Sequence, residues 1–177
     1  VNGLLLINVG TPDEPTPQAV RRYLRQFLSD PRVVDIHPIG RSLLLNLFIL
    51  PFRPKKSAAA YRKVWTSRGS PLLCNSLDLA AAVGDRLGAT WLVRIGMAYG
   101  SPSIPSAIDD LLAAGCTRLV VLPLYPQNAS SSTGAAVQAV CAALAHRQSP
   151  PPLCVLEPFY DDPGFLSVLA AHGRDVI

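Results

Sequence analysis

Four short apolar runs constrain the fold of this chain more than any other feature. They cover residues 3–9, 91–97, 118–124 and 153–157. Each run is continuous and does not alternate with polar residues, which is typical of parallel strands that are covered on both faces. The runs therefore predict four buried strands in one parallel sheet.

Helical patterns separate the predicted strands. Thr16 followed by Pro17 is typical of a helix start, and an apolar stripe follows at helical spacing. Arg21, Arg22 and Arg25 fall off that stripe and are interpreted as a solvated face. Further helices are predicted over 71–87, 103–114, 134–146 and 162–172. The last three steps between strands are then short βα units, and the chain is predicted to be an α/β protein with a doubly wound parallel four-stranded sheet.

The first connection is much longer than a crossover needs. More than eighty residues separate the first two predicted strands, which indicates an inserted segment at about 36–70. Within it, LLLNLFILPF (43–52) is almost entirely apolar, and Arg53, Lys55 and Lys56 follow at once. This segment is either a buried core helix or an amphiphilic lip that meets lipid or a hydrophobic ligand. The lip interpretation rests on four side chains: Leu47, Phe48, Ile49 and Phe52.

Composition excludes several classes of protein. With 177 residues, 49% of them hydrophobic and 16% charged, the chain fits one globular domain. The net charge is +4, but the basic residues are spread out, which argues against a nucleic-acid face. Four cysteines form no CxxC pair for zinc or redox chemistry, and Cys116 and Cys154 are predicted to be buried thiols in a reducing cytoplasm. No leader pattern and no apolar run of about 20 residues is seen.

A serine-rich loop follows the third predicted strand in VVLPLYPQNASSSTG (120–134). The carboxyl ends of parallel strands are where open α/β sheets bind ligands. Phosphate is not favoured as the ligand, because the chain has neither GxGxxG nor GxxxxGK[ST]. The simpler interpretation is that Ser132 or Thr133 caps the next helix.

Four ordered motifs resemble the amino-terminal half of ferrochelatase. They are GLLLINVGTPDEPTPQAVRRYLRQFLSDPRVVD (3–35), RPKKSAAAYRKVWTSRGSPL (53–72), MAYGSPSI (97–104) and LPLYPQNASSSTG (122–134). The resemblance implies two similar Rossmann-like, chelatase-like halves with a porphyrin between them. It also implies insertion of Fe²⁺ into protoporphyrin IX, or coproporphyrin, to form haem. Residues 1–177 would then be a single amino-terminal chelatase domain, with the second half absent.

The resemblance implies that seven residues line the porphyrin: Val9, Arg53, Tyr61, Ser70, Tyr99, Tyr125 and Ser130. Arg53 would meet a propionate. For the two strand-end tyrosines, a half-buried ring tied to the backbone by its hydroxyl is the structural alternative. Ser130 stands where some animal relatives have a cluster-ligating cysteine, so no iron–sulfur cluster is expected through it. The expected partners are the porphyrin, ferrous iron as a substrate, the second half and a membrane surface at the lip, with no nucleic acid.

Two departures from the family pattern bear on activity. Ala98 stands where the family usually has a basic residue, and Asn128 replaces an aromatic residue after YPQ. Either change is expected to lower activity or to alter substrate preference.

No catalytic or metal-binding residue is assigned in this chain. The family has its metallating histidine in a segment resembling FSxHGLP in the second half. His172 comes too early and lies on a helical pattern, and His37 and His146 lie in the insertion and at a helix end. Asp13 and Glu14 are explained by a turn. The chain alone is therefore expected to be inactive, and a porphyrin-binding module or a subunit that needs a separate second half is the alternative.

Overall fold

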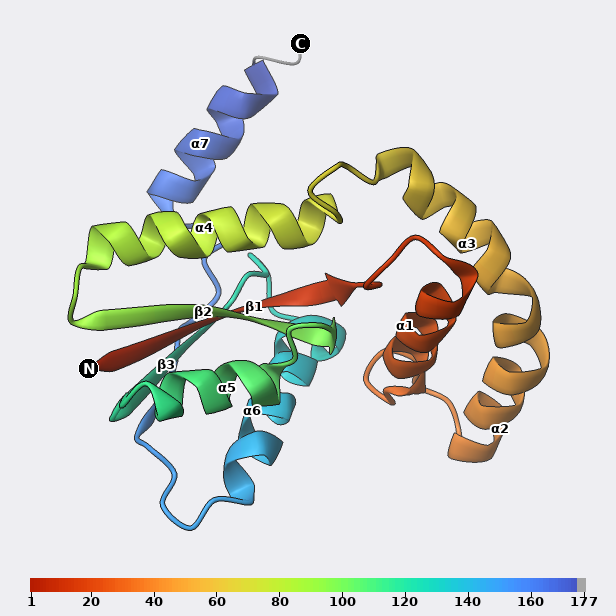
Figure 1. The fold of residues 1–177 in the computed structure, drawn as a ribbon, viewed down its shortest axis with the longest axis horizontal. Coiled ribbons are helices and arrows are strands. Elements are labelled where there is room, and N and C mark those ends of the chain that lie inside the picture. The colour runs from red at the N-terminus through yellow and green to blue at the C-terminus, as the bar shows by residue number, and fades with distance from the viewer. Residues whose placement is uncertain (175–177) are drawn as a thin grey trace.

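The computed structural model describes residues 1–174 and contains one parallel sheet. The strand order is β2-β1-β3-β4 (Figure 1). The four strands are β1 (Asn2–Thr11), β2 (Trp91–Gly100), β3 (Arg118–Pro123) and β4 (Leu153–Val155). All four predicted strands are confirmed; β1 and β2 extend further at their carboxyl ends and β4 is shorter than expected.

Helices cover both faces of the sheet. They are α1 (Pro17–Ser29), α2 (Pro38–Leu43), the π-helical segment η1 (Leu44–Ile49), α3 (Leu50–Val64), α4 (Pro71–Leu87), α5 (Ile104–Ala113), the π-helical segment η2 (Ser130–Gly134), α6 (Ala135–Ala145) and α7 (Pro163–Arg174). Helix α4 lies on one face and α5 and α6 on the other (Figure 1). This arrangement confirms the doubly wound α/β fold.

The central strand β1 explains why its apolar run is continuous. Leu4 and Leu6 pack in a core cluster with Ala80 of α4. Leu5 and Ile7 pack in a second cluster with helices α5 and α6. Because successive side chains of a strand point to opposite faces, a strand buried on both faces needs an apolar residue at every position.

Helix α1 begins as predicted. The Thr16 side-chain oxygen accepts a hydrogen bond from the Ala19 amide at 3.3 Å, which satisfies one free donor of the first turn. Val20 and Tyr23 are buried, whereas Arg21, Arg22 and Arg25 are exposed. The interpretation of these arginines as a solvated face is confirmed.

The long first connection forms an unbroken helical run from 38 to 64, made of α2, η1 and α3. It curves around α1 in Figure 1. Pro51 and Pro54 lie within this run and supply no amide hydrogen for regular α-helical bonding. Just before them the helix widens, and the Leu50 amide bonds to the Leu45 carbonyl five residues back.

The capping prediction for the serine-rich loop is wrong. Helix α6 follows directly on η2, so the helical backbone starts before Ser132 and Thr133. The Ser132 hydroxyl donates to the Ala129 carbonyl at 3.4 Å and accepts no amide of the helix. A hydroxyl inside the first turn cannot serve as the cap that precedes it.

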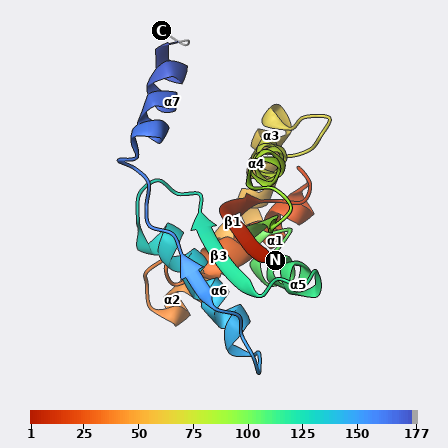
Figure 2. The same ribbon diagram turned by 90° about the vertical axis from the view of Figure 1, so that its left-hand side faces the viewer.

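The carboxyl-terminal elements lie at the edge of the fold. Strand β4 pairs only with β3, and α7 projects away from the sheet (Figures 1 and 2). The prediction that Cys154 is buried is therefore wrong, because this edge strand leaves its thiol exposed. Cys116 is buried as predicted. Among residues 1–174, no helix has the length and apolarity needed to span a bilayer.

Candidate functional site

Two glycines bring the carboxyl ends of β1 and β2 unusually close together. Gly10 pairs with Tyr99 and Thr11 with Gly100. Gly10 has φ +104°, and a Cβ there would lie 1.7 Å from the Tyr99 carbonyl oxygen. Gly100 has φ +93°, and its Cβ would lie 2.5 Å from the Thr11 carbonyl oxygen. Only glycine is compatible with both constraints, so this edge is built around the two positions.

Tyr99 is fixed between this edge and helix α1. Its ring meets Phe27 edge-on with the centroids 5.0 Å apart, and its hydroxyl donates to Asp30 Oδ2 at 2.7 Å. Burial, followed by the hydrogen bond to Asp30 and the charge of that carboxylate, raises the pKa of Tyr99 above its usual value. The alternative of a tyrosine ring tied to the backbone by its hydroxyl is thus only partly correct for Tyr99. Its hydroxyl is fixed by a hydrogen bond, but the acceptor is a carboxylate and not the backbone.

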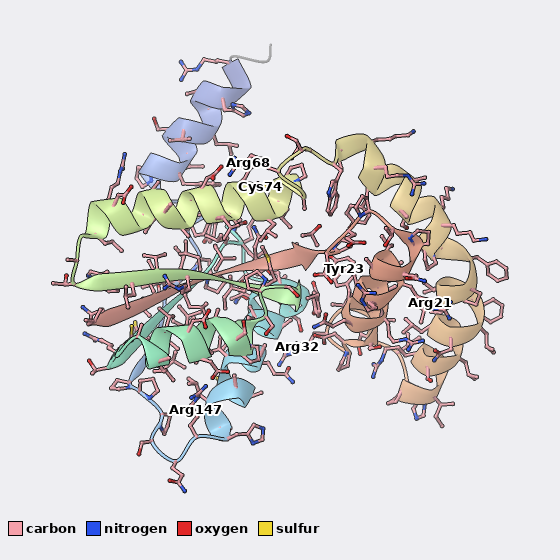
Figure 3. The ribbon with its side chains drawn as sticks, viewed as in Figure 1. Arg21, Tyr23, Arg32, Arg68, Cys74 and Arg147 are labelled. Atoms are coloured by element: carbon pink, nitrogen blue, oxygen red, sulfur yellow. The ribbon has the colours of Figure 1, made fainter. Side chains whose placement is uncertain are left out.

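Tyr23, on the buried apolar stripe of α1, is a further component of this region. Its hydroxyl donates to the Gly10 carbonyl at 3.3 Å, so the α1 side chain reaches the end of β1 (Figure 3). Burial raises the pKa of Tyr23, and the nearby hydroxyls of Tyr61 and Tyr125 raise it further. Tyr23, Tyr61, Tyr99 and Tyr125 are hereafter called the tyrosine cluster. Its members come from two helices and from two strand ends.

The other two members of the tyrosine cluster are only half-buried. Tyr125 follows β3 and packs against the core cluster under α5 and α6, and burial raises the pKa of its phenol to about 12. Tyr61 lies on α3 with its ring edge-on to Trp65 at 6.2 Å, and burial raises its pKa as well. All four phenols are therefore neutral at physiological pH. Because Tyr23 and Tyr99 already donate within the protein, Tyr61 and Tyr125 are the members that can donate hydrogen bonds to a carboxylate ligand.

Ser70 and Val9 belong to the end of β1. The Ser70 hydroxyl donates to Thr11 Oγ1 at 2.9 Å, and both side chains are buried. The Val9 amide donates to Asn8 Oδ1 at 2.8 Å, and the Val9 side chain is half-buried. Ser70 thus ties the start of α4 to the strand end, while its contact with a porphyrin, like that of Val9, stays a prediction.

Arg32 is a residue that the sequence analysis did not single out. Its Nη1 donates to Ser130 Oγ at 3.2 Å, and its Nε bonds to Gln138 Oε1. The segment after α1 is thereby joined to the serine-rich loop and to α6 (Figure 3). Ser130 is exposed apart from this bond, as is Asn128 in the same loop. No local sequence pattern signals a contact across about a hundred residues.

The lip segment (43–52) has apolar side chains both inside and outside the fold. Leu45 and Leu50 are buried, whereas Leu47, Phe48 and Phe52 are 58%, 65% and 73% exposed. Ile49 is half-buried, and Arg53 is exposed one residue beyond the segment. A simple core helix would bury these three side chains. Their exposure therefore agrees better with the amphiphilic lip than with a core helix.

The structure does not gather every predicted residue around one enclosed cavity. A cavity of about 180 Å³ at this edge is lined by Thr11, Tyr23, Gln26 and Gly100, together with Pro12, Asp13, Ala19, Arg22 and Ser101. Val9, Tyr99 and Tyr125 do not line it. Ala98, like Tyr125, packs against the core under α5 and α6. Among the residues that the structure describes, the carboxyl edge of the sheet is therefore open and not enclosed. The tyrosine cluster and the lip segment lie on this side of the fold.

The histidines occupy the positions that the patterns indicated. His172 is exposed in the last turn of α7, His146 ends α6, and His37 precedes α2. Within residues 1–174, no three His, Cys, Asp or Glu side chains meet where they would hold a metal ion.

A parallel sheet with helices on both faces and polar side chains at its carboxyl edge defines a Rossmann-type α/β domain. The family model described as ferrochelatase matches residues 1–177, and the chain belongs to that family. A ferrochelatase of Coxiella burnetii (strain CbuG_Q212) is 48% identical over 93% of the chain and 45% of its own length. A ferrochelatase of Actinobacillus pleuropneumoniae serotype 5b (strain L20) is 45% identical over 95% of the chain and 54% of its own length. The protein named ferrochelatase 2 of Shewanella oneidensis is 46% identical over 98% of the chain and 54% of its own length. The chain spans about half the length of these curated relatives.

Proposed function

We propose that this chain forms one side of the porphyrin site of a ferrochelatase. The reaction replaces the two pyrrole N–H protons of the porphyrin by Fe²⁺, releases both protons and gives haem. The family match over residues 1–177 carries this proposal. The choice between protoporphyrin IX and coproporphyrin is left open.

The carboxyl edge supplies the groups that such a ligand needs. A tetrapyrrole requires an apolar surface for its ring and donors for its propionates. Val9 and the tyrosine cluster would face the ring, with Ser70 and Ser130 at the margins of the site. Exposed Arg53 would pair with a propionate. The Ser130 hydroxyl is not a thiolate, so we expect no iron–sulfur cluster through it.

Metal insertion needs a base for the pyrrole protons, and we assign that base to a second half of the protein. His172 lies on the exposed face of α7, and the tyrosine cluster stays protonated because burial raises its pKa values. Exposed apolar residues after β4 and on α7, including Leu156, Leu166 and Leu169, would pack against that second half.

The lip segment would contact a membrane. Leu47, Phe48 and Phe52 would enter the interface, and Lys55 and Lys56 would meet anionic head groups. This would make the protein a peripheral one on the cytoplasmic side of a membrane.

A metallation assay tests the enzyme proposal. Zn²⁺ or Fe²⁺ is added to a porphyrin with this chain alone, and then with the missing half supplied. Activity that appears only on mixing would support the proposal. Turnover by the chain alone would refute the assignment of the base to the second half.

A porphyrin-binding module without turnover is the second candidate. Porphyrin fluorescence quenching measures binding independently of chemistry. Arg53→Gln is expected to weaken binding about tenfold, because a charge-assisted hydrogen bond is lost. Arg118→Gln, at the amino end of β3, is the matched control and should leave binding unchanged. Saturable binding without metallation in the presence of both halves would favour the module.

A further inference from the structure

The positive charge of the chain is concentrated in the helical lobe, defined here as residues 17–63. This lobe has ten Arg and Lys residues and two Asp residues, whereas the rest of the chain has six basic and ten acidic ones. The lobe therefore has a net charge of +8 and the remainder −4. Its elements α1, α2, η1 and α3 lie together at one end of the molecule (Figure 1).

A polar cavity opens on the surface of this lobe, between α1 and the start of the next helical run, and most of its polar side chains are exposed. Its volume is about 390 Å³. Arg25 and Ser29 of α1 face Arg41 and Ser42 of α2 across it, and Asn46 of η1 completes the polar lining. The cavity is distinct from the carboxyl edge, since its lining comes from α1, α2 and η1 and includes no strand residue.

The polar groups of this cavity are mostly hydrogen-bond donors. Arg41 Nη1 donates to the carbonyls of Val34 and Ile36 at 3.3 and 3.4 Å, which orients the guanidinium group. The Arg25 side chain forms no ion pair or hydrogen bond with any residue between 1 and 174. The Ser42 oxygen accepts from Asn46 Nδ2 at 3.4 Å, so its own hydrogen remains available. No carboxylate lines the cavity.

We propose that this cavity binds a phosphate group, either in a free phosphorylated molecule or in a lipid head group. Two guanidinium groups and two hydroxyls offer more donors than the two oxygens of a carboxylate can accept. The three peripheral oxygens of a phosphate monoester, either free or in a head group such as that of phosphatidic acid, match such a donor set, and arginine pairs with them in a bidentate manner. The cavity volume suits a phosphate group with part of its ester. The exposed lip segment begins on the same helical run, which would let lipid chains lie beside an occupied site.

Equilibrium dialysis of the full chain against inorganic phosphate, at constant ionic strength with chloride, tests the site. Saturable binding is expected. Arg25→Gln with Arg41→Gln should weaken it at least about tenfold, since hydrogen bonds to a charged group are lost. Arg25→Gln alone removes no side-chain hydrogen bond or ion pair among residues 1–174 and should weaken binding about threefold. The control Lys55→Gln with Lys56→Gln removes the same charge from the same lobe and should leave the affinity unchanged.

A vesicle experiment separates the two sources of the phosphate group. Phosphatidylcholine vesicles are prepared with phosphatidic acid or, at equal surface charge, with a fatty acid carboxylate. If the phosphate comes from a lipid, only the arginine variant loses the preference for phosphatidic acid, while the lysine variant weakens binding to both vesicles equally. Binding of inorganic phosphate that depends on both arginines, without a vesicle preference, assigns the site to a free phosphorylated molecule.

Three results would overturn the proposal. They are the absence of saturable binding in both experiments, equal losses for the arginine and lysine variants, and competition by acetate as strong as that by phosphate.

Discussion

The helical run 38–64, which includes the lip segment, and the carboxyl-terminal segment, residues 153–174, both expose large apolar side chains, yet their charges differ sharply. The helical run 38–64 has six basic residues and no acidic one. The carboxyl-terminal segment has three acidic residues and one arginine. We expect exposed apolar surface to form a contact in both cases, and charge to indicate which kind of contact. Cations beside apolar rings suit an anionic membrane, whereas apolar side chains without cations suit another protein surface.

Leu166→Asp with Leu169→Asp should have the largest effect on this comparison. The two side chains are 45% and 56% exposed here and lie three residues apart on α7. In a longer chain that includes the second half, they are expected to be buried. The double substitution should then lower the free energy of unfolding by about 4 kcal/mol or more. Denaturant unfolding measures the change.

The same substitution in residues 1–177 alone is the control. It should change stability by no more than about 0.5 kcal/mol, because exposed positions contribute little. Equal effects in the two chains would mean that α7 packs against this half and not against a second one.

Leu47→Asp with Phe48→Asp should weaken binding to anionic vesicles about 100-fold. Two exposed apolar side chains that enter the interface are replaced by anions that its surface repels. Vesicle sedimentation gives the affinity, and far-UV circular dichroism checks the fold. Loss of the helix and strand signals would show instead that the lip segment is part of the core.

Lys55→Gln with Lys56→Gln should weaken binding to the same vesicles roughly 30-fold, at about 1 kcal/mol for each charge. The loss should shrink as salt is raised, because screening already weakens the attraction. An effect that is independent of salt would contradict an electrostatic role and would remove the distinction between the two apolar surfaces.

Tyr125→Phe should have the smallest effect, and it concerns the tyrosine cluster next to the lip segment. Burial raises the pKa of Tyr125 from 10.0 to about 12 in the folded protein. The neutral phenol therefore stabilises the fold below pH 10, and this contribution is lost as the pH rises to about 12. Between pH 9 and pH 12, the free energy of unfolding should therefore fall by about 2 kcal/mol less in Tyr125→Phe than in the unchanged protein. Unfolding curves recorded across this range measure the difference. An identical loss in both proteins would mean that Tyr125 is solvated.

Local sequence patterns were sufficient for the elements but not for all contacts between them. The strands and the start of α1 follow from apolar periodicity and the Thr16 cap, which act within a few residues. Cys154 was predicted to be buried because its run is apolar, but burial depends on whether a helix covers that edge. The contacts of Tyr23 with Gly10 and of Arg32 with Ser130 join segments whose proximity the fold alone creates.

The sequence by itself determined the doubly wound sheet and the family, because hydrophobic periodicity and extended motifs are properties of neighbouring residues. Only the tertiary structure decided which lip side chains are exposed, that the tyrosine cluster forms, and that Arg25 and Arg41 face one cavity. These features depend on how distant helices pack, and packing is set by the whole chain and not by any one segment.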